Sequence, residues 1–139
     1  VLIDRTCQVM FAGEGDSRLV HVFPTSTGSS GFETRLQDGS QVFRFDPARG
    51  NNGWHNSYDY PVSGDNPLNG NMYMPLYFDN GQAIHGANNV PPSPQSKGCA
   101  RLRVANQDAL VDWLGLRDVG QPVWDEDEIG LVVSVQGRF

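Results

Sequence analysis

The residues of this sequence with the clearest chemical potential surround Cys99, in the stretch from Ser96 to Arg101. A cysteine is a nucleophile only as a thiolate, which needs access to the substrate and a base or cation close by. Gly98 carries no side chain next to the sulfur, so an acyl substrate can approach the backbone, and N–H groups near Cys99 can turn toward a developing oxyanion. Lys97 adds a positive charge that favours the thiolate. This stretch suits nucleophilic attack on an acyl carbon.

A base for this thiol is available in His85, fourteen positions earlier. The pattern predicts a short strand over residues 82–85 that ends at His85, and a second strand over residues 99–104. The two residues can meet if these strands are neighbours. Arg101 lies on the same side of its strand as Cys99, about 6–7 Å further along. There it can bind a substrate carboxylate or hold the site through a charge-assisted hydrogen bond.

Each of these residues also has a plain structural interpretation. A lone cysteine in a small protein is commonly buried and inert, and a histidine at a strand end commonly makes only structural hydrogen bonds. Ser96 and Gly98 are typical turn residues, and Arg101 can simply face solvent. From the residues alone, catalytic and structural roles both stay open for Cys99 and His85.

The elements that must position these residues are mostly short strands. Apolar and alternating runs predict strands over residues 1–3, 8–11, 19–23, 41–45, 72–78 and 129–135, the first two forming a hairpin. The last of them is apolar on both faces and is expected in the middle of a sheet. Pro75 places its strand at an edge or a bend. Residues 46–71 are rich in Gly, Asn, Pro, Asp and Ser and predict a long loop, either a lid or one wall of a cleft.

One helix is expected after the Cys99 strand, with Asn106 as its cap and Gly115 at its end. Its predicted buried stripe consists of Ala109, Leu110, Trp113 and Leu114. The predicted fold class is therefore mainly β, a sandwich-like arrangement of mixed sheets with one principal helix. The chain shows no repeat and no linker, so residues 1–139 are expected to form a single domain.

Composition excludes several classes of protein. The formal net charge is −6 with 10 Lys and Arg, and these are scattered, which argues against nucleic-acid binding. No stretch approaches the roughly 20 apolar residues of a membrane span. The acidic run at residues 125–128 is expected to be a solvated loop rather than a cation site. Because the chain starts at Val1, we interpret it as a mature form or an excised domain, and a missing signal peptide says nothing about export.

The two cysteines, Cys7 and Cys99, allow one disulfide. That bridge would consume the candidate nucleophile, and we expect Cys7 to be a packed thiol instead. A structural zinc site needs about four clustered ligands, whereas His21, His55 and His85 are dispersed. No metal and no cofactor are predicted.

The pair His85-Gly86, followed by Ser96-Lys97-Gly98-Cys99-Ala100-Arg101, resembles the signature of the L,D-transpeptidase (YkuD-type) catalytic domain. That signature is His-Gly, a variable spacer, Ser-His-Gly-Cys, a small or aliphatic residue, and Arg. The resemblance extends to residues 74–86, to the Ser26-Thr27-Gly28 turn and to the opening hairpin, and so covers nearly the whole chain.

The resemblance implies a β-sandwich-like fold and cysteine-dependent acyl transfer on peptidoglycan stem peptides, outside the cytoplasm and sensitive to carbapenems. Cys99 corresponds to the nucleophile that releases D-Ala from a tetrapeptide stem and forms a thioester, and His85 corresponds to its general base. The implied substrate and oxyanion site consists of Ser96, Lys97, Gly98, Arg101 and Gly86. A monomer is expected.

Two departures from the family pattern stand out. Lys97 occupies the place of the usual histidine before Gly-Cys, which bears on thiol pKa and substrate choice. Thr34 is followed by Arg35, where the family commonly has Thr-Pro. Two alternatives to the transpeptidase stay open: an L,D-carboxypeptidase that uses water as acceptor, and a non-catalytic cell-wall-binding domain whose thiol is silent.

Overall fold

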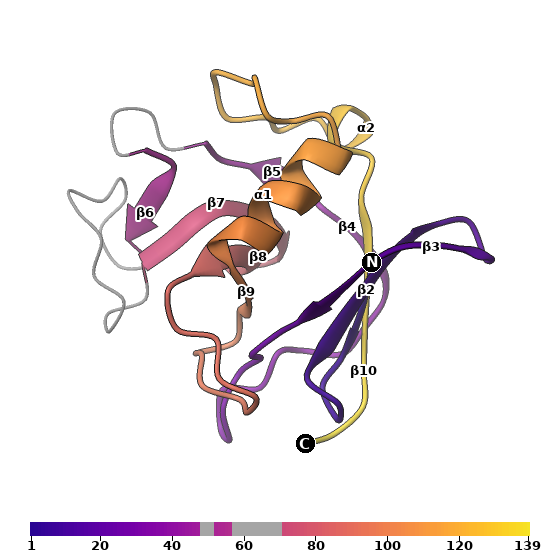
Figure 1. Ribbon diagram of the computed structural model, residues 1–139, viewed down its shortest axis with the longest axis vertical. Coiled ribbons are helices and arrows are strands. Elements are labelled where there is room, and N and C mark those ends of the chain that lie inside the picture. Colours follow the sequence, from indigo (N-terminus) through magenta and orange to yellow (C-terminus); the bar gives the residue numbers. More distant parts are fainter. Residues whose placement is uncertain (48–51, 57–70) are drawn as a thin grey trace.

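The computed structural model describes residues 1–47, 52–56 and 71–139, which form two mixed sheets, here called sheet A and sheet B. Sheet A consists of β1 (Leu2–Asp4), β2 (Val9–Glu14), β3 (Arg18–Pro24), β4 (Gln37–Gln41) and β10 (Val132–Gln136). Sheet B consists of β5 (Arg44–Phe45), β6 (Trp54–Asn56), β7 (Asn71–Asp79), β8 (Gln82–Ala87) and β9 (Ala100–Arg103). In Figure 1, sheet A lies on the right, and sheet B lies at centre and left with the principal helix across it. The predicted fold class is confirmed.

Sheet A, with the strand order β3-β2-β1-β10-β4, joins the two ends of the chain. β1 pairs antiparallel with β2, which confirms the opening hairpin, and parallel with β10. Ile3, Met10 and Val133 are fully buried on its inner face. β10 lies between β1 and β4, so the last strand is central as predicted, although it begins at Val132 rather than Ile129.

Sheet B, with the order β5-β7-β8-β9 and β6 beside β7, holds the two candidate strands side by side. β8 runs antiparallel to β7 and parallel to β9. A parallel pair needs a long connection, and residues 88–99 supply it. Leu76, Ile84 and Ala100 are fully buried in the core on one face of this sheet. Because side chains alternate along a strand, the residues between them point to the opposite face.

Pro75 corrects part of the sequence prediction. It lies within β7, which is interior to sheet B and not at its edge. The register between β7 and β8 shifts between Tyr73 and Leu76, so the proline sits at an irregularity of the ladder. A bulge is a place where a strand tolerates the missing N–H of proline, and the predicted bend is therefore confirmed.

Helix α1 (Val104–Trp113) follows β9 directly and contacts β8. The predicted cap at Asn106 is wrong: Arg103 precedes the helix in an extended conformation without a side-chain cap, because the strand leads into the helix with no turn between them. The predicted end is confirmed, since Leu114 caps the helix and Gly115 takes φ 75°.

The residues of α1 that are buried differ in part from the predicted ones. Leu110 and Val111 are fully buried, and so is the side chain of Gln107, while Trp113 packs against the core only in part. The Gln107 amide nitrogen donates to Met74 O at 2.8 Å and to Ile84 O at 3.3 Å. A polar residue thus ties the helix to both strands of the β7–β8 hairpin.

Two further segments differ from their predictions. The long loop predicted over residues 46–71 contains β6, and its parts 48–51 and 57–70 lie outside the described residues, as does any lid they form. The acidic run is exposed as expected, but it forms one turn of helix, α2 (Glu126–Ile129), capped by the Asp125 side chain, which accepts from Asp127 N. No helix in the described part of the chain is long and apolar enough to cross a membrane.

Candidate active site

The register of β8 against β9 brings the candidate residues together. His85 pairs directly with Arg101, and Ile84 pairs with Ala100. Cys99, just before β9, therefore stands beside Ala83, two residues along the neighbouring strand from His85. Since Ile84 and Ala100 face the core, alternation places Cys99, Arg101 and His85 on the opposite face of sheet B. The spacing in sequence alone permits this arrangement but does not require it.

The thiol of Cys99 lies in a partly buried position lined by the backbone of the β7–β8 turn. Its sulfur contacts Gly81 O at 3.7 Å. Burial raises the pKa of the Cys99 thiol, while a hydrogen bond from the Ala83 backbone and the charge of Arg101 act to lower it. Burial dominates, so the resting cysteine is a neutral thiol.

His85 is 3% exposed, and its ring is oriented by the backbone. Nδ1 lies 2.8 Å from Gly86 O, an acceptor, so Nδ1 carries the proton and donates to that carbonyl. Burial lowers the pKa of His85 to about 4, the Gly86 carbonyl opposes this shift, and the Arg101 charge adds to it. Nε2 therefore keeps its lone pair at neutral pH, which is the state that a general base requires.

The thiol and the imidazole are neighbours without a direct bond. Among the described residues, the sulfur of Cys99 makes its hydrogen bond to Gly81 O, and the ring of His85 makes its own to Gly86 O. Catalytic hydrogen bonds are commonly long before substrate binds. A rotation about the Cα–Cβ bond of Cys99 moves the sulfur away from Gly81 and changes its distance to the ring.

Ser96 holds the turn that precedes the thiol. Its hydroxyl donates to Cys99 O at 2.5 Å and accepts from Gly98 N at 3.1 Å. Because that hydroxyl occupies the Gly98 N–H, this group is not available to an oxyanion, which leaves the Cys99 N–H as the candidate donor. Ser96 is itself buried, with 3% exposure, so it supports the turn through these hydrogen bonds and is not open to a substrate.

Gly98 is required for a reason that differs from the sequence interpretation. Its φ of 122° disfavours any side chain. A Cβ at this position would lie 2.5 Å from Nε2 of Gln82. The space that a side chain of Gly98 would occupy is thus filled by Gln82.

The turn predicted from the resemblance, Ser26-Thr27-Gly28, lies against this site. Ser26 and Arg101 exchange two backbone hydrogen bonds, at 2.9 and 3.1 Å. Thr27 O accepts from Ser96 N at 3.1 Å, and Gly28 pairs with Ser96 as an isolated bridge. This segment therefore covers the free edge of β9 and fixes both ends of the turn at residues 96–99, here called the nucleophile turn after the candidate role of Cys99.

The two cations near the thiol have different surroundings. Arg101 is partly buried, and in the described part of the chain no carboxylate lies within 4.0 Å of its guanidinium. It faces His85 and can attract an anion, whether thiolate or substrate carboxylate. Burial lowers the pKa of Arg101, and the thiolate of Cys99 would raise it. Lys97 is exposed to solvent.

A second polar group on the same sheet escaped the sequence interpretation. Arg44 pairs in register with Tyr77, and Tyr77 pairs with Ala83, which is the residue beside Cys99 on the neighbouring strand. The Arg44 guanidinium forms an ion pair with Asp46 and lies 5.4 Å from the centre of the Tyr77 ring. Burial raises the pKa of Tyr77 to about 12, Arg44 opposes the shift, and Cys99 adds to it. No motif singles these residues out, because strand register alone unites them.

Cys7 corrects another expectation. Both cysteines are free thiols, and Cys7 is exposed in the turn after β1 rather than packed. Its backbone N–H donates to Asp4 Oδ1 at 3.1 Å. Within the described residues, no group of three His, Cys, Asp or Glu side chains lies close enough together to hold a metal ion.

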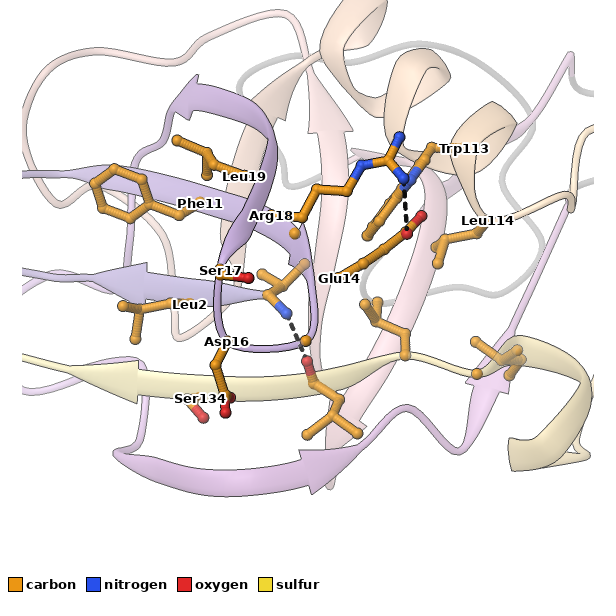
Figure 2. A pocket seen from close by; sticks show the side chains of 17 residues that line it. Leu2, Phe11, Glu14, Asp16, Ser17, Arg18, Leu19, Trp113, Leu114 and Ser134 are labelled. Carbon is orange, nitrogen blue, oxygen red and sulfur yellow. Dashed lines mark hydrogen bonds and ion pairs between the residues drawn. The ribbon is translucent and has the colours of Figure 1, made fainter.

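A hollow in the described surface lies away from this site. A groove of about 1000 Å³ lies between the β2–β3 turn, the end of α1 and β10. Figure 2 shows Phe11 and Leu19 on one side of it, and Trp113 and Leu114 on the other, with the Glu14–Arg18 ion pair between them. None of the candidate residues lines this groove.

Comparisons with known proteins agree with this fold. Solved L,D-transpeptidases share the fold: one from Stackebrandtia nassauensis has a TM-score of 0.66 and 22% identity over 99% of this chain and 54% of its own. One from Xylanimonas cellulosilytica has a TM-score of 0.62 and 23% identity over 97% and 58%, respectively. An L,D-transpeptidase solved in complex with imipenem has a TM-score of 0.63 and 14% identity over 97% and 57%.

The chain thus spans somewhat more than half of these solved proteins. No curated protein matches its sequence. The YkuD family profile, described as the L,D-transpeptidase catalytic domain, matches residues 1–124. The chain therefore belongs to the YkuD family of L,D-transpeptidase catalytic domains.

Proposed function

We propose that this protein is a peptidoglycan L,D-transpeptidase in which Cys99 is the nucleophile and His85 the general base. The sulfur attacks the carbonyl carbon before the terminal D-Ala of a tetrapeptide stem while His85 Nε2 takes the thiol proton. The C–N bond then breaks, the proton passes to the leaving amine, and D-Ala departs. The resulting thioester is attacked by an amine of a second stem, which forms a new amide and restores the thiol.

The observation that carries this proposal is the shared face of sheet B. Cys99, His85 and Arg101 point to the same side of two adjacent parallel strands, and the Nδ1–Gly86 hydrogen bond leaves Nε2 of His85 as an acceptor. Arg101 supplies a charge that both a thiolate and a stem carboxylate can use. The Cys99 N–H is the proposed oxyanion donor.

The family context supports the choice of substrate and location. Members of this family act on cell-wall peptidoglycan, so we place the protein in the cell envelope or outside the cell. We assign Arg101 and Lys97 to the substrate side of the site. Gly86 faces Tyr73 and Gln107 on the other side of the sheet and contributes only its carbonyl, which holds the His85 ring. Ser96 and Gly98 shape the turn that precedes the thiol.

Acylation by a carbapenem tests the nucleophile directly. Imipenem is a suitable probe because a relative of the same fold has been solved in complex with it. Thiolate attack opens the β-lactam ring, so the protein should gain the full mass of imipenem on the peptide that contains Cys99. Cys99→Ala should abolish the adduct, and it should also abolish D-Ala release from a tetrapeptide stem.

Cys7→Ser is the matched control, since it removes the other, exposed thiol. It should leave both the adduct and D-Ala release unchanged. An adduct on Cys7, or neither adduct nor D-Ala release from the folded wild-type protein, would contradict the proposed function.

A further inference from the structure

Gln82 is a buried polar residue beside the nucleophile turn with no part in the proposed chemistry. It begins β8, is 7% exposed, and lies between Gly81 and Ala83. Gly81 offers its carbonyl to the Cys99 sulfur, and Ala83 contributes the backbone hydrogen bond that acts on the thiol. The backbone on both sides of Gln82 therefore lines the thiol.

Both ends of the Gln82 carboxamide make a hydrogen bond. Oε1 accepts from Arg35 N at 2.9 Å, and Nε2 donates to Glu33 O at 3.2 Å. Both partners belong to residues 33–35, a segment far from Gln82 in the chain. The amide thus clamps that segment to the start of β8.

The same amide also rests against Gly98. Nε2 lies 2.5 Å, and Cδ 3.1 Å, from where a Cβ of Gly98 would stand. Gly98 is buried and is the residue immediately before Cys99. Three segments, residues 33–35, the start of β8 and the nucleophile turn, therefore meet at one side chain.

We propose that Gln82 is a positioning residue of the nucleophile: its clamped carboxamide packs against Gly98 and fixes the Cys99 sulfur and N–H relative to His85. The inference rests on the proposed function, because positioning matters only if Cys99 reacts. Gln82 does not touch the reacting atoms and acts through the Gly98 turn. A shift of about 1 Å in such a group can slow the chemistry about 100-fold.

Gln82→Met tests this role, because methionine fills the space but makes neither hydrogen bond. The matched control is Gln37→Met: Gln37 also ties two segments together, donating to Asp79 Oδ2 at 2.5 Å, but does not touch Gly98. Both variants are made in a Cys7→Ser background so that Cys99 is the sole thiol. The readouts are the rate of acylation by imipenem, the pH profile of alkylation by iodoacetamide, and the thermal midpoint.

In Gln82→Met we expect acylation by imipenem to slow about 10- to 100-fold. Alkylation by the small reagent should instead become faster, with its pH midpoint moved down toward that of a free cysteine, because the turn loosens around the thiol. Opposite changes in the two rates, with a thermal midpoint no lower than that of Gln37→Met, distinguish positioning from general destabilisation. Gln37→Met should keep both rates.

A double-mutant cycle with Gly98→Ala probes the contact itself. In the wild-type background the new Cβ meets Gln82, whereas Gln82→Ala removes those three nearest atoms and leaves the strain of a positive φ. Gly98→Ala should therefore slow acylation less in the Gln82→Ala background.

Additive effects in that cycle would overturn the inference. So would a folded Gln82→Met protein with wild-type acylation and alkylation profiles, or a Gln37→Met protein with the same changes as Gln82→Met. If the wild-type protein is not acylated by imipenem and releases no D-Ala, the proposed function fails. The pH profile of alkylation by iodoacetamide still tests the role of Gln82 in that case. A profile of Gln82→Met that matches the wild type overturns that role.

Discussion

At the scale of single residues, the site combines a neutral thiol with a neutral imidazole. Burial raises the pKa of Cys99 and lowers that of His85 to about 4, so in each case the uncharged form is favoured. In the proposed mechanism, the charged pair forms when the sulfur reaches Nε2 and a substrate carbonyl accepts the attack.

The low pKa of His85 predicts a pH-dependent stability. A histidine with a pKa of 6.5 when unfolded and about 4 when folded binds more protons in the unfolded state between these values, so stability falls as pH drops through that window. Between pH 7 and pH 5 the loss from His85 amounts to about 2 kcal/mol. Urea unfolding of wild type and His85→Gln at both pH values measures it.

His55 also contributes to the pH dependence of the unfolding free energy and must be separated from His85. Burial lowers its pKa too, with Asp46 acting in the opposite direction, so it contributes a loss of the same sign. His85→Gln should keep the His55 share and lose its own. If the variant loses as much stability as the wild type between pH 7 and pH 5, His85 is not the buried neutral residue described above.

At the scale of elements, the nucleophile turn depends on one hydroxyl. Ser96→Ala removes the donor to Cys99 O and the acceptor for Gly98 N, leaving two buried backbone groups without that partner. We expect a loss of about 1–3 kcal/mol in unfolding free energy. Acylation by imipenem should also slow, because the Cys99 N–H turns with its peptide. Urea unfolding and the acylation rate provide the two measurements.

Ser40→Ala is the matched control for Ser96. The hydroxyl of Ser40 donates to Phe78 O at 2.8 Å, a bond of the same kind in a part-buried position on β4. This variant should lose stability without slowing acylation. Equal slowing in both variants would mean that the acylation rate follows overall stability and not the turn.

Some residues of the candidate site can be predicted from the sequence, and others cannot. Cys99 and His85 can be identified because their residue types are rare and their spacing matches a family pattern. Gln82 cannot, because its role rests on contacts with Arg35 and Gly98, which lie far from it in the chain. Patterns report which face of a strand is apolar, whereas strand register, which aligns Arg44 with Tyr77, is a property of the folded sheet.

The two ends of helix α1 differ in how well the sequence predicts them. The end of α1 is predicted correctly, because Gly115 adopts a left-handed conformation that few other residues accept. Its start is not, because Asn106 is a good cap only where the chain turns, and here β9 runs straight into the helix. A terminus set by local backbone conformation is visible in the sequence, whereas one set by packing is not.

At the scale of the whole molecule, one core joins the two sheets. Ile3 and Val133 of sheet A belong to the same buried cluster as Leu76, Ile84 and Leu102 of sheet B. The face of sheet B that carries the candidate residues therefore depends on side chains of a sheet that carries none of them. The segment after β3 strengthens this dependence by pairing with the edge of β9.

Ile3→Ala tests this dependence at a distance from the site. Ile3 is fully buried in β1, between β2 and β10, and its truncation should lower the unfolding free energy by about 2–5 kcal/mol. If both sheets unfold as one unit, the urea midpoint for exposure of the Cys99 thiol should fall together with the midpoint for loss of circular dichroism. Thiol labelling in a Cys7→Ser background, followed in parallel with circular dichroism, gives both midpoints. A dichroism midpoint that falls while the thiol midpoint stays at its wild-type value would show that sheet B holds the nucleophile independently of sheet A.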